Sequence, residues 1–186
     1  MKDTRNKYYL VGIPTCGKTT LGRRVSEHMD MAYFDTDDMA ADQVKKENNE
    51  RFSFFSYLDS VYDEQKKAIV WLSTFDSPAI VATGAEIALI PDCVELMRST
   101  GFIIFIDRIL EKILDAMQDN PPSGPVMAAH KDDGSFIYMH EERVKIYESE
   151  RPKYRAIADY TLDNNGSEDE GAEKLAALIR ALSLDG

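Results

Sequence analysis

The sequence has few of the residues that build disulfide frameworks or zinc sites. Its 186 residues include two cysteines and three histidines. Cys16 and Cys93 form no CxxC pair, and neither stands at metal-ligand spacing from a histidine. This scarcity excludes a disulfide-stapled fold and a Cys/His zinc site, and it predicts two reduced thiols that bind no metal.

Long apolar runs and basic clusters are also missing. No apolar stretch approaches the roughly 20 residues of a membrane span, and the first residues lack the pattern of a secretory signal. Acidic side chains outnumber basic ones by 33 to 22, a net charge of -11. Without an apolar span or a signal, we expect a cytoplasmic protein that does not bind membranes. Because an acidic surface repels the nucleic-acid backbone, we also expect no binding to nucleic acid. With no coiled-coil seam in the sequence, we also expect a monomer.

Apolar strand-like segments alternate with helix-like segments along the chain. Leu21, Val25 and Met29, for example, lie on one face of a helix. This alternation predicts one α/β domain over residues 1–186, with a parallel sheet and right-handed crossovers. The expected strands are 8–12, 32–34, 79–82, 102–106 and 159–162. The expected helices are 18–29, a stretch after residue 37, 57–73, 108–118, 139–150 and 168–182.

One segment interrupts this alternation. Residues 120–135 contain three prolines and two glycines and show little periodicity. Such a segment is typical of a surface loop, and in a phosphotransferase it is also where a mobile lid would lie.

The strongest motif is Gly12-Ile13-Pro14-Thr15-Cys16-Gly17-Lys18-Thr19, which matches the phosphate-binding pattern Gly-x-x-x-x-Gly-Lys-Ser/Thr. It stands between an apolar strand and an amphipathic helix, where backbone N–H groups converge on phosphates. Lys18 is expected to reach the β- and γ-phosphates and Thr19 to ligate Mg²⁺. The alternative is a glycine-rich turn without a ligand. The residues expected to bind ATP are Gly12, Thr15, Cys16, Gly17, Lys18, Thr19 and Thr20.

Beyond this loop the chain resembles the shikimate kinase family. The resemblance rests on four segments: residues 17–23, Tyr33-Phe34-Asp35-Thr36-Asp37, the strand before Thr83-Gly84, and residues 151–161 with Arg151-Pro152-Lys153-Tyr154-Arg155. It implies a three-layer P-loop NTPase fold, a five-stranded parallel sheet of order 2-3-1-4-5 with helices on both faces, and a lid loop. The implied reaction moves the γ-phosphoryl group of ATP to a hydroxyl of a small polyol acid, with shikimate first among the acceptors.

The resemblance also implies roles for individual residues. Lys18 and Asp37 would be catalytic, with Asp37 holding the attacking hydroxyl. Asp35 would help to hold Mg²⁺, Gly84 would lie against the substrate ring, and Arg151 would pair with the substrate carboxylate. The residues themselves support the aspartates, because α/β folds bind ligands at the carboxyl ends of their strands. The alternatives are a helix N-cap for Asp37 or Asp38 and a surface ion pair with a glutamate for Arg151.

Three departures from the family pattern bear on the acceptor. Asp63 stands where the family has a substrate-binding arginine, the family's glycine triplet reads Gly84-Ala85-Glu86, and its lid Arg-Pro pair reads Gly124-Pro125. Lys131 is the one base in that loop.

Two readings of these departures stay open. If Asp63 and Glu86 face the acceptor, a neutral or amine-bearing polyol is favoured over shikimate; otherwise both acids point into solvent. The competing hypotheses are therefore a kinase of the same fold with another acceptor, such as a sugar or sugar acid, and a nucleotide-binding protein with little transferase activity.

Overall fold

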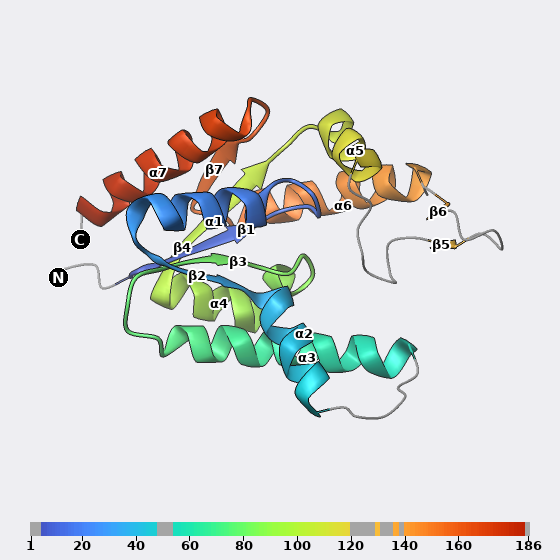
Figure 1. The fold of residues 1–186 in the computed structure, drawn as a ribbon, viewed down its shortest axis with the longest axis horizontal. Helices are drawn as coiled ribbons and strands as arrows, with labels where there is room; N and C mark the ends of the chain where they lie inside the picture. Colours follow the sequence, from blue (N-terminus) through green and yellow to red (C-terminus); the bar gives the residue numbers. More distant parts are fainter. Residues whose placement is uncertain (1–4, 48–53, 120–128, 131–135, 138–139, 185–186) are drawn as a thin grey trace.

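The computed structural model describes residues 5–47, 54–119, 129–130, 136–137 and 140–184 (Figure 1). Its centre is a parallel five-stranded sheet of order β2-β3-β1-β4-β7. With its five strands numbered in chain order, this is the order 2-3-1-4-5 that the resemblance implied. The strands are β1 (Lys7–Val11), β2 (Ala32–Asp35), β3 (Ala79–Ala82), β4 (Gly101–Asp107) and β7 (Tyr160–Asp163).

Helices cover both faces of the sheet because its inner strands are apolar on both sides. Every residue of β1, β3 and β4 is buried. Side chains of β1 alternate, so Tyr8 and Leu10 pack in one core cluster while Tyr9 and Val11 pack in the other. Helices α1 (Lys18–Met29) and α7 (Glu168–Leu184) cover the first face. The second face lies under α3 (Phe54–Ser73), α4 (Pro91–Thr100), α5 (Leu110–Asp119) and α6 (His140–Ile157).

The remaining elements lie at the carboxyl ends of the strands. Helix α2 (Thr36–Glu47) follows β2 directly and lies beside α3 (Figure 1). A short 3-10 turn, η1 (Ile87–Leu89), leads from β3 into α4. Sequence reasoning did not predict η1 or α4, although Pro91 stands at the start of α4, as is common for a helix.

Helix α6 is longer than the predicted helix 139–150. It runs on through Pro152 to Ile157. Pro152 has no backbone N–H, so the carbonyl of Glu148, four residues earlier, has no hydrogen-bond donor within the helix. Because Glu148 is exposed, solvent can satisfy that carbonyl, and the helix continues.

The predicted lid, residues 120–135, lies largely outside the described residues. The exception is β5 (Ala129–His130), which pairs antiparallel with β6 (Phe136–Ile137). The prediction of a lid in this segment therefore stays a prediction.

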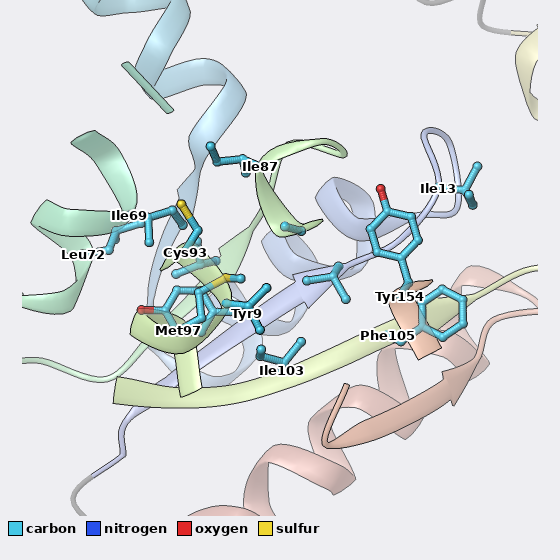
Figure 2. Packing of buried hydrophobic residues seen from close by; sticks show 14 of the residues in the cluster. Tyr9, Ile13, Ile69, Leu72, Ile87, Cys93, Met97, Ile103, Phe105 and Tyr154 are labelled. Carbon is cyan, nitrogen blue, oxygen red and sulfur yellow. The ribbon is translucent and has the colours of Figure 1, made fainter. Parts of the chain in front are cut away.

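Tyr154 of α6 joins the core to the loop after β3. Its ring is fully buried and stacks on Phe105 of β4, with the ring centroids 6.0 Å apart (Figure 2). Its hydroxyl donates a hydrogen bond of 2.7 Å to the carbonyl of Ala85. This contact fixes the chain just after β3, beside the glycine loop that follows β1.

The structure describes the state of both cysteines and the length and hydropathy of the helices. Both cysteines are buried and free. Of the helices in the described part of the chain, none has the length and hydropathy of a membrane span.

Removing the Tyr154 hydroxyl tests this packing. Tyr154→Phe keeps the stacked ring but leaves the Ala85 carbonyl without its donor, so we expect a loss of about 1–3 kcal/mol in the free energy of unfolding. Tyr160→Phe removes the same group from an exposed tyrosine and should change stability by less than about 0.5 kcal/mol. Urea titrations of both variants measure the difference, and equal effects would contradict the assigned contact.

Candidate active site

The glycine loop wraps around the side chain of Lys18. This lysine is buried, and its ammonium donates to the carbonyls of Gly12 at 2.7 Å and Ile13 at 3.3 Å. Gly17 has a φ of 107°, and a Cβ there would lie 2.5 Å from the Asn164 amide nitrogen. Only glycine fits that position, because a side chain would face both a strained backbone and a close neighbour.

Asn164 holds this loop from the other end of the chain. Its buried side-chain amide donates to the carbonyl of Cys16 at 2.8 Å. Its backbone N–H donates to the carbonyl of Asp107, also at 2.8 Å, where β7 ends beside β4. The loop after β1 is therefore fixed by a residue that sequence reasoning did not single out.

A cavity of about 570 Å³ opens beside the loop. Of the residues predicted to bind ATP, Gly12 and Cys16 are not in its lining. Their carbonyls instead accept hydrogen bonds from Lys18 and Asn164. The lining consists of Thr15, Gly17, Lys18, Thr19, Thr20, Arg108, Lys112, Asp115, Ala116 and Glu168.

Two bases in this cavity were missed from the sequence. Arg108 follows β4 directly and donates to the carbonyl of Thr15 at 3.2 Å. Its Nε is buried and has no hydrogen-bond partner among the described residues. Lys112 lies one helical turn further on and donates to the carbonyl of Asn165. With Lys18 they give an acidic protein a locally cationic cavity, which suits a polyphosphate.

The Asp-Thr-Asp motif lies directly opposite the loop. The Thr19 hydroxyl donates to Asp35 at 2.9 Å, and the Tyr33 hydroxyl donates to the same oxygen at 3.2 Å. The other Asp35 oxygen accepts from the backbone N–H of Asp37 at 3.1 Å. The N-cap contact that was the alternative for Asp37 or Asp38 is thus made by Asp35, just before α2.

The Thr19 and Asp35 oxygens fit a magnesium ion. Mg²⁺ prefers hard oxygen ligands and commonly takes one or two from the protein, the rest coming from phosphates and water. In the described part of the chain there is no cluster of three acidic, histidine or cysteine ligands. A magnesium site that takes one hydroxyl and one carboxylate from the protein, beside a phosphate loop, does not need such a cluster of three ligands.

Asp37 is solvent-exposed as a residue, and its carboxylate lies beside Gln65 and Gly84. Gln65, a nearly buried residue of α3, donates a hydrogen bond to its carboxylate. A Cβ on Gly84 would lie 2.5 Å from the Asp37 oxygen, so a larger residue there would displace the ends of the Asp37 and Gln65 side chains. Burial raises the pKa of Asp37, the charge of Asp35 raises it further, and the charge of Lys18 lowers it. Asp37 and Lys18 are therefore close enough to act on one another.

Arg151 makes an ion pair within the protein. Its guanidinium donates two hydrogen bonds of 2.8 Å to the Asp107 carboxylate at the end of β4. Arg155, one turn along α6, donates to the same carboxylate at 2.8 Å. The ion pair suggested as the alternative for Arg151 thus exists, but with an aspartate of the sheet instead of a glutamate. Its predicted contact with a substrate carboxylate stays a prediction.

The three acids near the expected acceptor position differ in their placement. The Asp63 side chain is 69% exposed and lies 3.5 Å from Lys66, so it points into solvent. Glu150 is half-buried, and its carboxylate lies 3.4 Å from the Tyr154 hydroxyl. Burial raises the pKa of Glu150, and the charge of the exposed Glu86 raises it further.

Comparisons with known proteins agree with this geometry. Residues 14–180 match the sequence profile of the family described as shikimate kinase. A shikimate kinase of Clostridium botulinum is 28% identical over 176 residues, which cover 94% of this chain and 98% of that protein. The profile match therefore includes the loop from Pro14 onward, both aspartates and helix α6.

Solved structures share the fold. A shikimate kinase from Acinetobacter baumannii, solved in complex with shikimate, has a TM-score of 0.70 at 20% identity, covering 98% of this chain and 94% of that chain. A shikimate kinase from Bacteroides thetaiotaomicron has a TM-score of 0.72 at 17% identity, covering 94% and 98%. With the family profile spanning most of the sequence, this chain belongs to the shikimate kinase family.

Proposed function

We propose that this protein transfers the γ-phosphoryl group of ATP to a hydroxyl of shikimate. Its family membership supports the reaction class. The observation that carries the proposal is the hydrogen bond between Thr19 and Asp35, which joins the phosphate loop to the Asp-Thr-Asp motif. This bond joins the two oxygens that we propose as Mg²⁺ ligands, which supports a single point where phosphate and acceptor meet.

The nucleotide half of the site is built from the loop and the cationic cavity. Backbone N–H groups of the loop, other than Pro14, hold the phosphates at the start of α1. Lys18 exchanges its bonds to loop carbonyls for phosphate oxygens, and Arg108 has a buried N–H available to the same group. A Mg²⁺ ion held by Thr19 and Asp35 would supply further neutralisation of phosphate charge.

The acceptor half is built around Asp37. Gln65 occupies one carboxylate oxygen and fixes the orientation of the group. The carboxylate then orients the attacking hydroxyl or takes its proton, and its raised pKa suits that task better than an ordinary aspartate would. Gly84 packs directly against this carboxylate and Gln65, so the segment after β3 adjoins the proposed acceptor position.

Arg151 remains our candidate for the substrate carboxylate. A guanidinium suits that contact, but here Asp107 already occupies two of its donors. Arg155 can keep Asp107 paired while Arg151 turns toward a ligand. We infer that binding the carboxylate requires this exchange of partners.

Turnover with shikimate tests the proposed function. In a coupled assay of ADP release from Mg-ATP, we expect release that depends on shikimate. Lys18→Ala should lower kcat at least about 100-fold, since phosphate charge loses its stabilising partner. Asp37→Asn should lower it about 10²–10⁴-fold through loss of the base.

The control is Asp38→Asn, which removes the adjacent charge from an exposed pair with Arg23 and should leave turnover unchanged. ATP binding with no stimulation by shikimate would contradict the proposed acceptor.

The raised pKa of Asp37 predicts that this residue costs stability when it is ionised. Because folding raises its pKa, the contribution of Asp37 to stability is largest at low pH and is lost as the pH rises through that value. An asparagine at this position cannot ionise but still accepts the bond from Gln65. In thermal unfolding without ligands, Asp37→Asn should therefore be close to wild type near pH 4 and more stable at pH 7–8. A wild type that is the more stable protein at neutral pH would contradict this.

A further inference from the structure

A second carboxylate, that of Glu150, comes from a different element than Asp37. Burial raises the pKa of both acids, whereas the charge of Lys18 lowers it in both. Asp37 comes from the start of α2, and Glu150 comes from α6.

The loop after β3 connects these two carboxylates. The Tyr154 hydroxyl lies 3.4 Å from Glu150 and donates to the Ala85 carbonyl. The preceding residue, Gly84, packs against Asp37 and donates its N–H to Thr36 at 2.8 Å. Glu150 therefore borders the same short segment that the acceptor is expected to contact.

Among the residues that the structure describes, the cations around Glu150 are either exposed or engaged elsewhere. Lys18 binds phosphate in the proposed reaction. Lys153 lowers the pKa of Glu150, but its side chain is exposed to solvent. Glu86 adds a further negative charge on the same side. The guanidinium groups of Arg151 and Arg155 already share Asp107.

A purely structural role accounts poorly for Glu150. Tyr154 donates its proton to Ala85 at 2.7 Å, so the 3.4 Å contact with Glu150 is the weaker of the two. A half-buried carboxylate that is not needed to satisfy its neighbour costs desolvation energy.

We propose that Glu150 is a specificity-determining residue, which disfavours a carboxylate on the acceptor and favours a neutral or amine-bearing group at that position. This inference rests on the proposed function and concerns the same site. The physical reason is like-charge repulsion in a partly desolvated space, where the acceptor's own carboxylate meets Glu150 and Glu86. An uncharged group escapes this repulsion, and an ammonium can in addition donate a hydrogen bond to Glu150.

The experiment compares shikimate with its methyl ester, which keeps the ring and all three hydroxyls but has no charge. For each acceptor, kcat/KM is measured in the wild type, in Glu150→Gln and in Glu148→Gln. Glu148→Gln is the matched control, because it removes the same charge from an exposed residue two positions away on the same helix. In the wild type we expect the ester to be used better than the acid.

Glu150→Gln should lower the ester-to-acid ratio about tenfold, mainly through a lower KM for shikimate, and Glu148→Gln should leave the ratio at its wild-type value. A second measurement uses the wild type alone and so does not depend on the folding of any variant. Raising the salt concentration should improve the use of shikimate relative to the ester, since salt screens the repulsion and acts equally on ATP in both reactions.

Each outcome decides the matter. A ratio that is the same in all three proteins and unaffected by salt overturns the inference and leaves the proposed function standing. No phosphorylation of either acceptor by any of the proteins, with ADP still bound, overturns the proposed function and this inference with it.

Discussion

The site is organised by the buried ammonium of Lys18. Carbonyls of Gly12 and Ile13 hold it at the end of β1, and its charge opposes the effect of burial on the pKa of Asp37 and of Glu150, which come from two different helices. The loop can take this shape because Gly17 adopts a positive φ and because Asn164 ties the Cys16 carbonyl to the end of β7. The central strands, buried on both faces, fix the positions from which these groups converge.

Local signals predicted much of this arrangement. The glycine loop with its lysine and the Asp-Thr-Asp motif were found from the sequence because each consists of closely spaced residues. The loop lies between β1 and α1, and the motif lies where β2 meets α2. The sheet order followed from the resemblance. The predicted end of α6 at residue 150 was wrong, because a proline such as Pro152 normally stops a helix. Here the Glu148 carbonyl, which loses its hydrogen-bond partner, belongs to an exposed residue.

Residues brought in by tertiary contacts were not predictable in the same way. Gln65 reaches Asp37 from a helix 28 positions further on, and Arg108 enters the nucleotide cavity from the end of β4. The departure at position 63 is on the solvent side, while Glu150 lies half-buried beside the Tyr154 hydroxyl. Family membership therefore defines the reaction class, and the proposed role of Glu150 concerns the choice of acceptor.

The central claim is that nucleotide and acceptor meet at Lys18. A crystal structure with ADP, Mg²⁺ and shikimate tests it most directly. The account predicts phosphates on residues 12–19, the nucleoside in the cavity beside Arg108 and Lys112, and an acceptor hydroxyl within hydrogen-bond distance of Asp37. An acceptor bound away from Asp37, or a nucleotide outside that cavity, would contradict it.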